Sequence, residues 1–128
     1  MGFVPVYDHQ IRVYAEDVDY MGIVYHSNYL CYFERARTEL LRKNNVLLSE
    51  LMKQDILFAI HEISIKYIYP ARLDDYLNIK TSISEIRHCS LVFNQRMFNQ
   101  DQKLICRAQI QVACVDSNLK PKRLPRFR

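Results

Sequence analysis

The sequence predicts an α+β fold in which one long helix covers an antiparallel sheet of about five strands. The first observation is a run of apolar residues with helical spacing, from about residue 27 to residue 43. The second is the alternation of apolar and polar residues that begins after residue 55 and continues to residue 114. The connectors between the alternating segments are short, which favours antiparallel neighbours.

A first strand is expected before the helix. Ile11, Val13 and Ala15 alternate with polar or aromatic neighbours, as residues do on a strand with one buried face. This strand is expected to end at a turn over residues 17–22.

The helix is expected to begin near residue 27. Its apolar residues recur at spacings of three and four and are Tyr29, Phe33, Ala36, Leu40 and Leu41. The pair Asn44-Asn45 interrupts this pattern. A further short helical segment is expected within residues 46–53.

The first alternating segment after the helix changes parity along its length. Phe58 and Ile60 share one parity, whereas Ile63 and Ile65 share the other. A β-bulge near His61–Glu62 would bring both pairs to the same face of the sheet.

Three further strands are expected over residues 77–83, 91–97 and 104–114, because apolar residues alternate cleanly in each. The connectors at 72–75, 87–88 and 99–102 are short. They predict that each strand lies beside the next one in the chain.

Composition excludes several classes of protein. No apolar run approaches the roughly 20 residues that a membrane helix needs, and residues 1–5 lack the features of a signal peptide, so a cytoplasmic protein is expected. The net charge is +4, and five basic residues and no acidic residue fall in the last ten positions. The remaining body is near neutral, which does not favour nucleic-acid binding. The four cysteines are widely scattered, so we expect buried free thiols rather than a zinc site or disulfides.

Residues 17–37 contain a candidate active site. Two carboxylates (Asp17 and Asp19), a glycine (Gly22) and a histidine (His26) are contained in one turn that leads into the helix. Hydrolysis of an activated acyl group needs a carboxylate that attacks or deprotonates water, and N–H groups that stabilise the oxyanion. The start of a helix supplies such N–H groups.

Two motifs resemble one known family. They are Asp19-x-x-Gly22-x-Val24-Tyr25-His26-x-Asn28-Tyr29 followed by Phe33-Glu34-Arg35-Ala36-Arg37, and Pro70-Ala71-Arg72-Leu73-Asp74-Asp75. They resemble hotdog-fold acyl-CoA thioesterases of the 4-hydroxybenzoyl-CoA thioesterase type, and most closely the small bacterial branch associated with the Tol–Pal cell-envelope system. The resemblance implies a hotdog fold, with a long central helix wrapped by a curved sheet. We expect one thioesterase domain over residues 1–118 and a basic tail over residues 119–128.

The resemblance also implies site roles. Asp19 is expected to be the catalytic carboxylate and His26 its catalytic partner. Gly22, Tyr25 and Asn28 are expected to bind substrate, and capping of the helix is the alternative for Tyr25 and Asn28. The alternative for Asp19 and Asp17 is turn capping, which we expect for Asp17. No metal and no cofactor are expected, since thioesters need no Lewis acid and no second histidine lies at ligand spacing.

One departure from the family pattern concerns the substrate pocket. Between Asp19 and Gly22, where small residues are expected, the chain has Tyr20 and Met21. Glu34, Arg35 and Arg37 are expected to form ion pairs on the helix rather than to react.

The expected partners follow from the resemblance and the tail. The substrate would be an acyl-CoA, which is hydrolysed to the free acid and coenzyme A by a homodimer or homotetramer with a site at each subunit boundary. The tail has three readings: a solvated end, a clamp for coenzyme A phosphates or an acidic acyl carrier protein, or a contact with anionic membrane lipid. A non-catalytic acyl-carrier-protein or envelope adaptor is the alternative function, and a hotdog dehydratase is a second enzymatic one.

Overall fold

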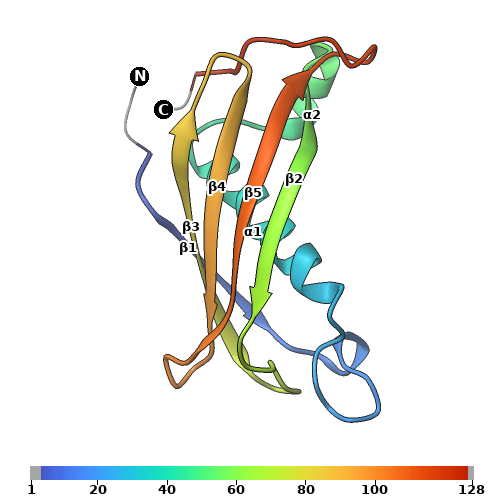
Figure 1. The fold of residues 1–128 in the computed structure, drawn as a ribbon, viewed down its shortest axis with the longest axis vertical. Coiled ribbons are helices and arrows are strands. Elements are labelled where there is room, and N and C mark those ends of the chain that lie inside the picture. Colours follow the sequence, from blue (N-terminus) through green and yellow to red (C-terminus); the bar gives the residue numbers. More distant parts are fainter. Residues whose placement is uncertain (1–3, 127–128) are drawn as a thin grey trace.

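The computed structural model describes residues 4–126 and contains one antiparallel sheet with a long helix on one face (Figure 1). The elements are β1 (Tyr7–Arg12), a 3-10 turn (Ala15–Asp17), α1 (Asn28–Lys43), α2 (Leu48–Lys53), β2 (Leu57–Tyr67), β3 (Tyr76–Ile86), β4 (Ser90–Phe98) and β5 (Leu104–Val115). The expected α+β fold class, with a helix covering a five-stranded sheet, is confirmed.

The strand order is β1-β3-β4-β5-β2, and all neighbours are antiparallel. The connectors at 87–88 and 99–102 join neighbouring strands, as predicted. The connector at 72–75 does not, because β2 pairs with β5 at the far edge of the sheet. The prediction that β2 and β3 are neighbours is therefore wrong, since a short connector limits distance but does not select a pairing partner.

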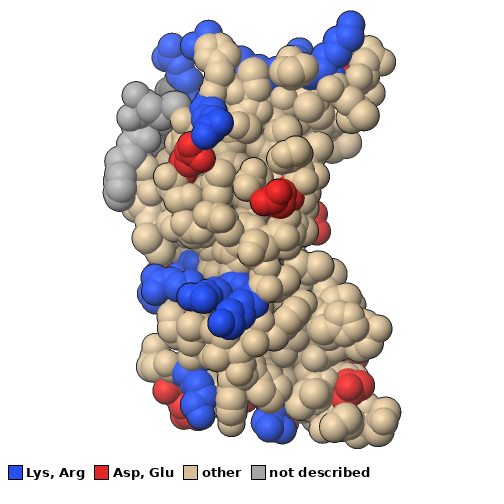
Figure 2. Space-filling model, viewed as in Figure 1, with Lys and Arg blue, Asp and Glu red and all other residues tan. Residues whose placement is uncertain are grey.

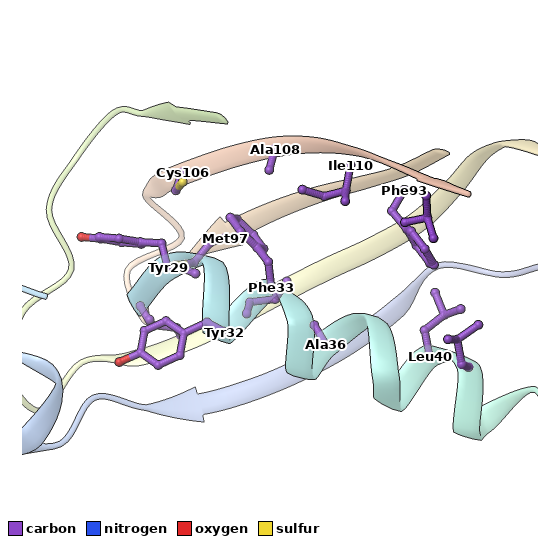
Figure 3. Close-up of a cluster of buried hydrophobic side chains, with 14 of the residues drawn as sticks. Tyr29, Tyr32, Phe33, Ala36, Leu40, Phe93, Met97, Cys106, Ala108 and Ile110 are labelled. Carbon is purple, nitrogen blue, oxygen red and sulfur yellow. The ribbon is translucent and has the colours of Figure 1, made fainter. Parts of the chain in front are cut away.

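The hydrophobic core lies between α1 and the inner face of the sheet (Figure 3). The core side chains labelled in Figure 3 come from α1, β4 and β5: Tyr29, Tyr32, Phe33, Ala36, Leu40, Phe93, Met97, Cys106, Ala108 and Ile110. The helical spacing of the apolar residues explains this arrangement, since it places them on one side of α1.

A polar network crosses this core. The guanidinium of Arg37 is buried and donates a hydrogen bond to Oε1 of Gln95 (3.0 Å), and Nε2 of Gln95 donates to the hydroxyl of Thr81 (3.0 Å) and to the carbonyl of Phe33 (2.9 Å). The prediction that Arg37 forms an ion pair on the surface of the helix is therefore wrong. Burial lowers the pKa of Arg37.

β1 begins and ends earlier than the sequence predicts. Val13 is buried, but its backbone pairs with the carbonyl of Asp75 (2.9 Å) instead of continuing β1, and Ala15 lies in the 3-10 turn. The carboxylate of Asp17 accepts a hydrogen bond from the N–H of Tyr14 (2.9 Å), which fixes this turn. The β-bulge expected near His61–Glu62 is confirmed, because the register shifts between Ile60 and Glu62.

The edge of the sheet formed by β2 is partly uncovered. β2 is an edge strand of 11 residues. Its inner face carries Ile60, Ile63 and Tyr67, which remain exposed although their partners on β5 are buried. None of the helices in the described part is long and apolar enough to cross a membrane.

The described part of the basic tail, residues 119–126, runs back over the end of the sheet. Pro121 bridges to Val115, the N–H of Lys122 donates to the carbonyl of Cys114 (2.8 Å), and the N–H of Leu124 donates to the carbonyl of His88 (3.0 Å). The side chain of Leu124 packs against the core. Arg128, the last basic residue of the expected tail, lies outside the described residues.

Candidate active site

The loop between β1 and α1 carries the candidate site at one end of the molecule (Figure 1). Asp19, Gly22, Tyr25 and His26 lie on this loop, and Asn28 is the first residue of α1. The five residues selected from the sequence are therefore brought together by a single connection.

A tight turn holds Asp19. The N–H of Gly22 donates to the carbonyl of Asp19 (2.9 Å), and the N–H of Asp19 donates to the carbonyl of Ile23 (3.0 Å). Gly22 has φ = 79°, a conformation that side chains disfavour, and a Cβ there would meet nothing within 4 Å. Glycine is therefore required by the backbone conformation and not by lack of space.

The carboxylate of Asp19 is partly exposed, and Oδ1 accepts a hydrogen bond from the N–H of Met21 (2.8 Å). This contact is the turn capping expected as the alternative role of Asp19. It engages one oxygen, while Oδ2 has no hydrogen-bond partner in the part of the chain that the structure describes. Capping and reaction are compatible, because the bond orients the carboxylate and leaves one oxygen accessible.

The second motif anchors the turn. The N–H of Val24 donates to the carbonyl of Ala71 (2.8 Å), and the N–H of Leu73 donates to the carbonyl of Gly22 (3.1 Å). The hydroxyl of Tyr29 on α1 accepts a hydrogen bond from the N–H of Ala71 (3.1 Å). The two motifs noted in the sequence thus form one unit.

His26 is exposed, and its ring packs on that of Tyr25 with centroids 4.6 Å apart. Its carbonyl accepts a hydrogen bond from the hydroxyl of Tyr67 on β2 (2.9 Å). No hydrogen bond joins His26 to Asp19 within residues 4–126. Sequence reasoning did not select Tyr67, and its long-range contact leaves no local signal in the sequence.

The start of α1 offers backbone donors. The N–H of Tyr25 donates to the carbonyl of Asp17 (3.1 Å), and that of Asn28 donates to the carbonyl of Tyr25 (2.9 Å). The N–H groups of His26 and Ser27 donate to no other residue among those described. These two donors are therefore available to a ligand.

Asp17 links the loop to the helix. Its Oδ1 accepts a hydrogen bond from Nδ2 of Asn28 (3.3 Å), and Tyr32 lies beside the carboxylate. Burial raises the pKa of the Tyr32 hydroxyl, and the neighbouring Asp17 raises it further. The capping role expected for Asp17 agrees with these contacts.

The two buried cysteines, Cys106 and Cys114, have raised pKa values. Burial raises the pKa of Cys106 to about 12, so its thiol stays protonated at neutral pH. Cys114 is also buried, whereas Cys31 on α1 is exposed, so the expectation of buried thiols is wrong for Cys31. Within the described residues, no three His, Cys, Asp or Glu side chains come together as a metal site would require.

A cavity of about 310 Å³ lies farther along α1, between the helix and the sheet. Its walls are mostly apolar, and Arg37 and Glu34 contribute its charged groups. It opens beside β2, where the inner face of the sheet is exposed.

Comparisons with known proteins identify the family of this chain. The family model of the Thioesterase-like superfamily matches residues 13–127. The acyl-CoA thioester hydrolase YbgC of Escherichia coli O6:H1 is 44% identical over 117 residues, which cover 91% of this chain and 87% of the relative. The acyl-CoA thioesterase YbgC of Haemophilus influenzae is 40% identical over 118 residues, with coverage of 91% and 86%.

A solved structure gives the same result for the fold. The crystal structure of a probable thioesterase from Bartonella henselae superposes with a TM-score of 0.87 at 33% identity, and covers 94% of this chain and 100% of that one. The expected resemblance to hotdog-fold thioesterases is confirmed. From its sequence and its fold, the chain belongs to the Thioesterase-like superfamily.

Proposed function

We propose that the protein hydrolyses acyl-CoA thioesters, with water as the second substrate and a free carboxylic acid and coenzyme A as the products. The observation that carries this proposal is the position of Asp19, whose carboxylate is held on the loop that leads into α1, with one oxygen that accepts no hydrogen bond from the described residues. The names and identities of the two YbgC relatives support acyl-CoA as the substrate.

Asp19 acts on the carbonyl carbon of the thioester. It either attacks directly, which gives a mixed anhydride that water then opens, or removes a proton from the attacking water. In both routes the C–S bond breaks and the thiolate leaves. A thiolate is a good leaving group because a free thiol has a pKa of about 8.5, so a strong general acid is not required.

Backbone N–H groups stabilise the oxyanion. Those of His26 and Ser27 donate to none of the described residues and lie immediately before α1, where the helix dipole favours negative charge. An oxyanion donor of this kind is typically worth about 3–4 kcal/mol in the transition state. The imidazole of His26 orients the substrate carbonyl or the carboxylate once substrate is bound, since the two side chains are not bonded to each other here.

The active unit is a homodimer joined along β2. This edge strand exposes its backbone and three large apolar side chains, Ile60, Ile63 and Tyr67, and such an edge favours pairing with a second strand. Tyr67 also contacts the carbonyl of His26. A partner on this edge would therefore border the candidate site, in agreement with the subunit-boundary site that the resemblance implies.

The test is the variant Asp19→Asn, assayed for thiol release from a panel of acyl-CoA and acyl-carrier-protein thioesters. The amide keeps the turn bond to Met21 but cannot act as a nucleophile or base, so kcat/KM should fall by about 100-fold or more. Asp74→Asn is the matched control, because it makes the same chemical change in the adjacent loop, at an exposed residue with φ = 72° that asparagine tolerates. Normal turnover in folded Asp19→Asn would refute the assignment of Asp19, and a wild-type protein that hydrolyses none of the panel would refute the proposed function.

A further inference from the structure

The face of the sheet opposite α1 carries a row of positive charges (Figure 2). In the register of the sheet, Lys66 on β2 is paired with Arg107 on β5, Arg107 with Arg96 on β4, and Arg96 with Lys80 on β3. One cation therefore lies on each of four adjacent strands. Figure 2 shows Lys and Arg side chains, in blue, gathered in a patch at mid-height on this face.

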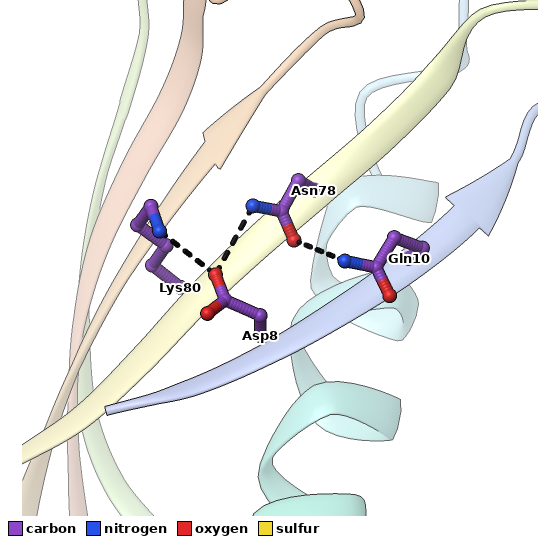
Figure 4. Close-up of polar contacts among 4 residues, drawn as sticks. All are labelled: Asp8, Gln10, Asn78 and Lys80. Atoms are coloured by element: carbon purple, nitrogen blue, oxygen red, sulfur yellow. Dashed lines mark hydrogen bonds and ion pairs between the residues drawn. The ribbon is translucent and has the colours of Figure 1, made fainter. Parts of the chain in front are cut away.

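Only one end of the row is neutralised. Lys80 forms an ion pair with Asp8 on β1 (2.8 Å), and the same carboxylate oxygen of Asp8 accepts a hydrogen bond from Asn78 (Figure 4). Lys66, Arg96 and Arg107 form no ion pair with the residues that the structure describes. These three exposed side chains form what we term the cation row.

The cation row carries an energetic cost. Side chains at paired positions on neighbouring strands have Cβ atoms about 5 Å apart, and like charges at such positions destabilise a sheet. Arg107 lies between two cations that form no ion pair with the described residues, Lys66 and Arg96. An arrangement of this kind is stabilised when an anion from outside the chain binds to it.

The surroundings of the cation row suit an anion with several phosphate groups. A hollow of about 500 Å³ lies over the row, and its other lining residues include Ser64, Ser82, Asn94 and Gln109. These hydroxyl and amide groups form the adjacent row on the same face and can donate hydrogen bonds to phosphate oxygens. Guanidinium groups bind phosphate through two parallel hydrogen bonds.

We propose that the cation row binds a phosphate chain, such as the di- or triphosphate group of a nucleotide or an inorganic polyphosphate. The chain would lie across β2, β5 and β4, contacting Lys66, Arg107 and Arg96 in turn. This site lies on the outer face of the sheet, whereas the core and α1 lie on the inner face. It is a second site, and its test does not depend on thioester hydrolysis.

The test measures binding of inorganic tripolyphosphate by calorimetry and its effect on Tm, with sodium chloride added to match ionic strength. Wild-type Tm should rise by about 5 °C at a tripolyphosphate concentration about ten times the Kd. Arg107→Gln should weaken binding about tenfold or more, because it removes a charge-assisted contact. In buffer without polyanions the same variant should melt at a higher temperature than the wild type, since repulsion within the row is reduced.

The matched control is Lys53→Gln, which removes one exposed positive charge from α2 and leaves the cation row intact. It should bind tripolyphosphate as the wild type does. Equal losses in Lys53→Gln and Arg107→Gln would reduce the effect to net charge and overturn the proposal, as would no wild-type binding at matched ionic strength. Arg96→Gln provides a second variant of the row and should behave as Arg107→Gln does. ATP and coenzyme A are titrated separately. The first titration tests a nucleotide triphosphate as the ligand, and the second tests the diphosphate of coenzyme A.

Discussion

Asp17 and Asp19 are two positions apart, yet their carboxylates have different partners. Both oxygens of Asp17 accept hydrogen bonds, from the N–H of Tyr14 and from the side chain of Asn28. Asp19 accepts one bond within its own turn. The sequence motif selects the segment that contains both carboxylates. Their hydrogen bonds distinguish Asp17, as a structural residue, from Asp19, as the candidate catalytic residue.

The variant Asp17→Asn should keep most of the hydrolytic activity but lower the thermal stability. The amide replaces one accepting oxygen with an N–H donor, so one of the bonds to Tyr14 or Asn28 is lost, at a cost of about 1 kcal/mol. Thermal melting and thiol-release assays on the same preparation check this. Loss of activity without loss of stability would mean that Asp17, and not Asp19, is the reacting carboxylate.

The variant His26→Ala should reduce kcat less than Asp19→Asn does, because it leaves the backbone donors of His26 and Ser27 in place. The pH–rate profiles of the variant and the wild type, measured side by side, show whether the imidazole contributes to the pH dependence. His26→Gln is the comparison, since it retains a side-chain hydrogen-bond donor but cannot act as an acid or base. A profile and a rate identical to those of the wild type would make the imidazole of His26 a structural group.

At the scale of elements, periodicity predicts α1 and the strands β3, β4 and β5 well, because each buries one face over many residues. It also locates the β-bulge of β2, whose register shift restores Ile60 and Ile63 to one face. It fails for the end of β1, where hydrogen bonds to Asp75 and the capping of the 3-10 turn by Asp17 replace the strand. These contacts involve distant residues or a side chain, which apolar alternation does not record.

The turn of Gly22 provides a test at this scale. Gly22→Ala should destabilise the protein by about 1 kcal/mol through backbone strain alone, since the space around the added Cβ is open. Gly22→Asn should lose less, because asparagine tolerates positive φ better. Denaturant unfolding of the three proteins measures the order. Equal stability of Gly22→Ala and the wild type would show that the turn relaxes to another conformation.

At the scale of the whole molecule, strand order and assembly depend on contacts that short connectors do not specify. β2 lies at one edge because it pairs with β5, and its inner face is left partly uncovered by α1. The sequence shows the alternation of β2 but not its edge position. The proposed dimer depends on this position.

The variant Ile63→Lys should convert the proposed dimer to a monomer and abolish most activity, because it places a charge on the apolar face of the exposed edge. Light scattering and thiol release measure the two effects. Gln10→Lys, on the opposite edge strand β1, is the control and should leave the dimer intact. An active wild-type monomer, or an intact dimer of Ile63→Lys, would exclude assembly along β2.

Two variants of the basic tail distinguish a role in stability from a role in substrate recognition. Truncation after Asn118 should lower Tm, because it removes the backbone bonds of Lys122 and Leu124 and the contact of Leu124 with the core. A second variant keeps the backbone but removes five charges, and its Tm should be nearly unchanged. It replaces five basic residues by glutamine: Lys120, Lys122, Arg123, Arg126 and Arg128.

If the tail contacts coenzyme A phosphates or an acidic carrier, this glutamine variant should show a raised KM with little change in kcat, and the wild-type KM should rise with salt. A KM that is the same for both proteins and insensitive to salt would indicate a tail without a substrate role. Loss of binding to anionic vesicles with unaltered kinetics would instead indicate a lipid contact.

The hydrogen bonds of Val24 and Leu73 across the two motifs also constrain how the protein folds. A nascent chain that has emerged only as far as the end of α1 contains all five candidate site residues, yet it lacks Ala71 and Leu73, which hold the turn. The site therefore forms only after β2 and the loop that follows it have been synthesised and docked. During refolding, recovery of activity should coincide with protection of the Val24 and Leu73 amides from hydrogen exchange. No N-terminal fragment that lacks residues 71–73 should be active.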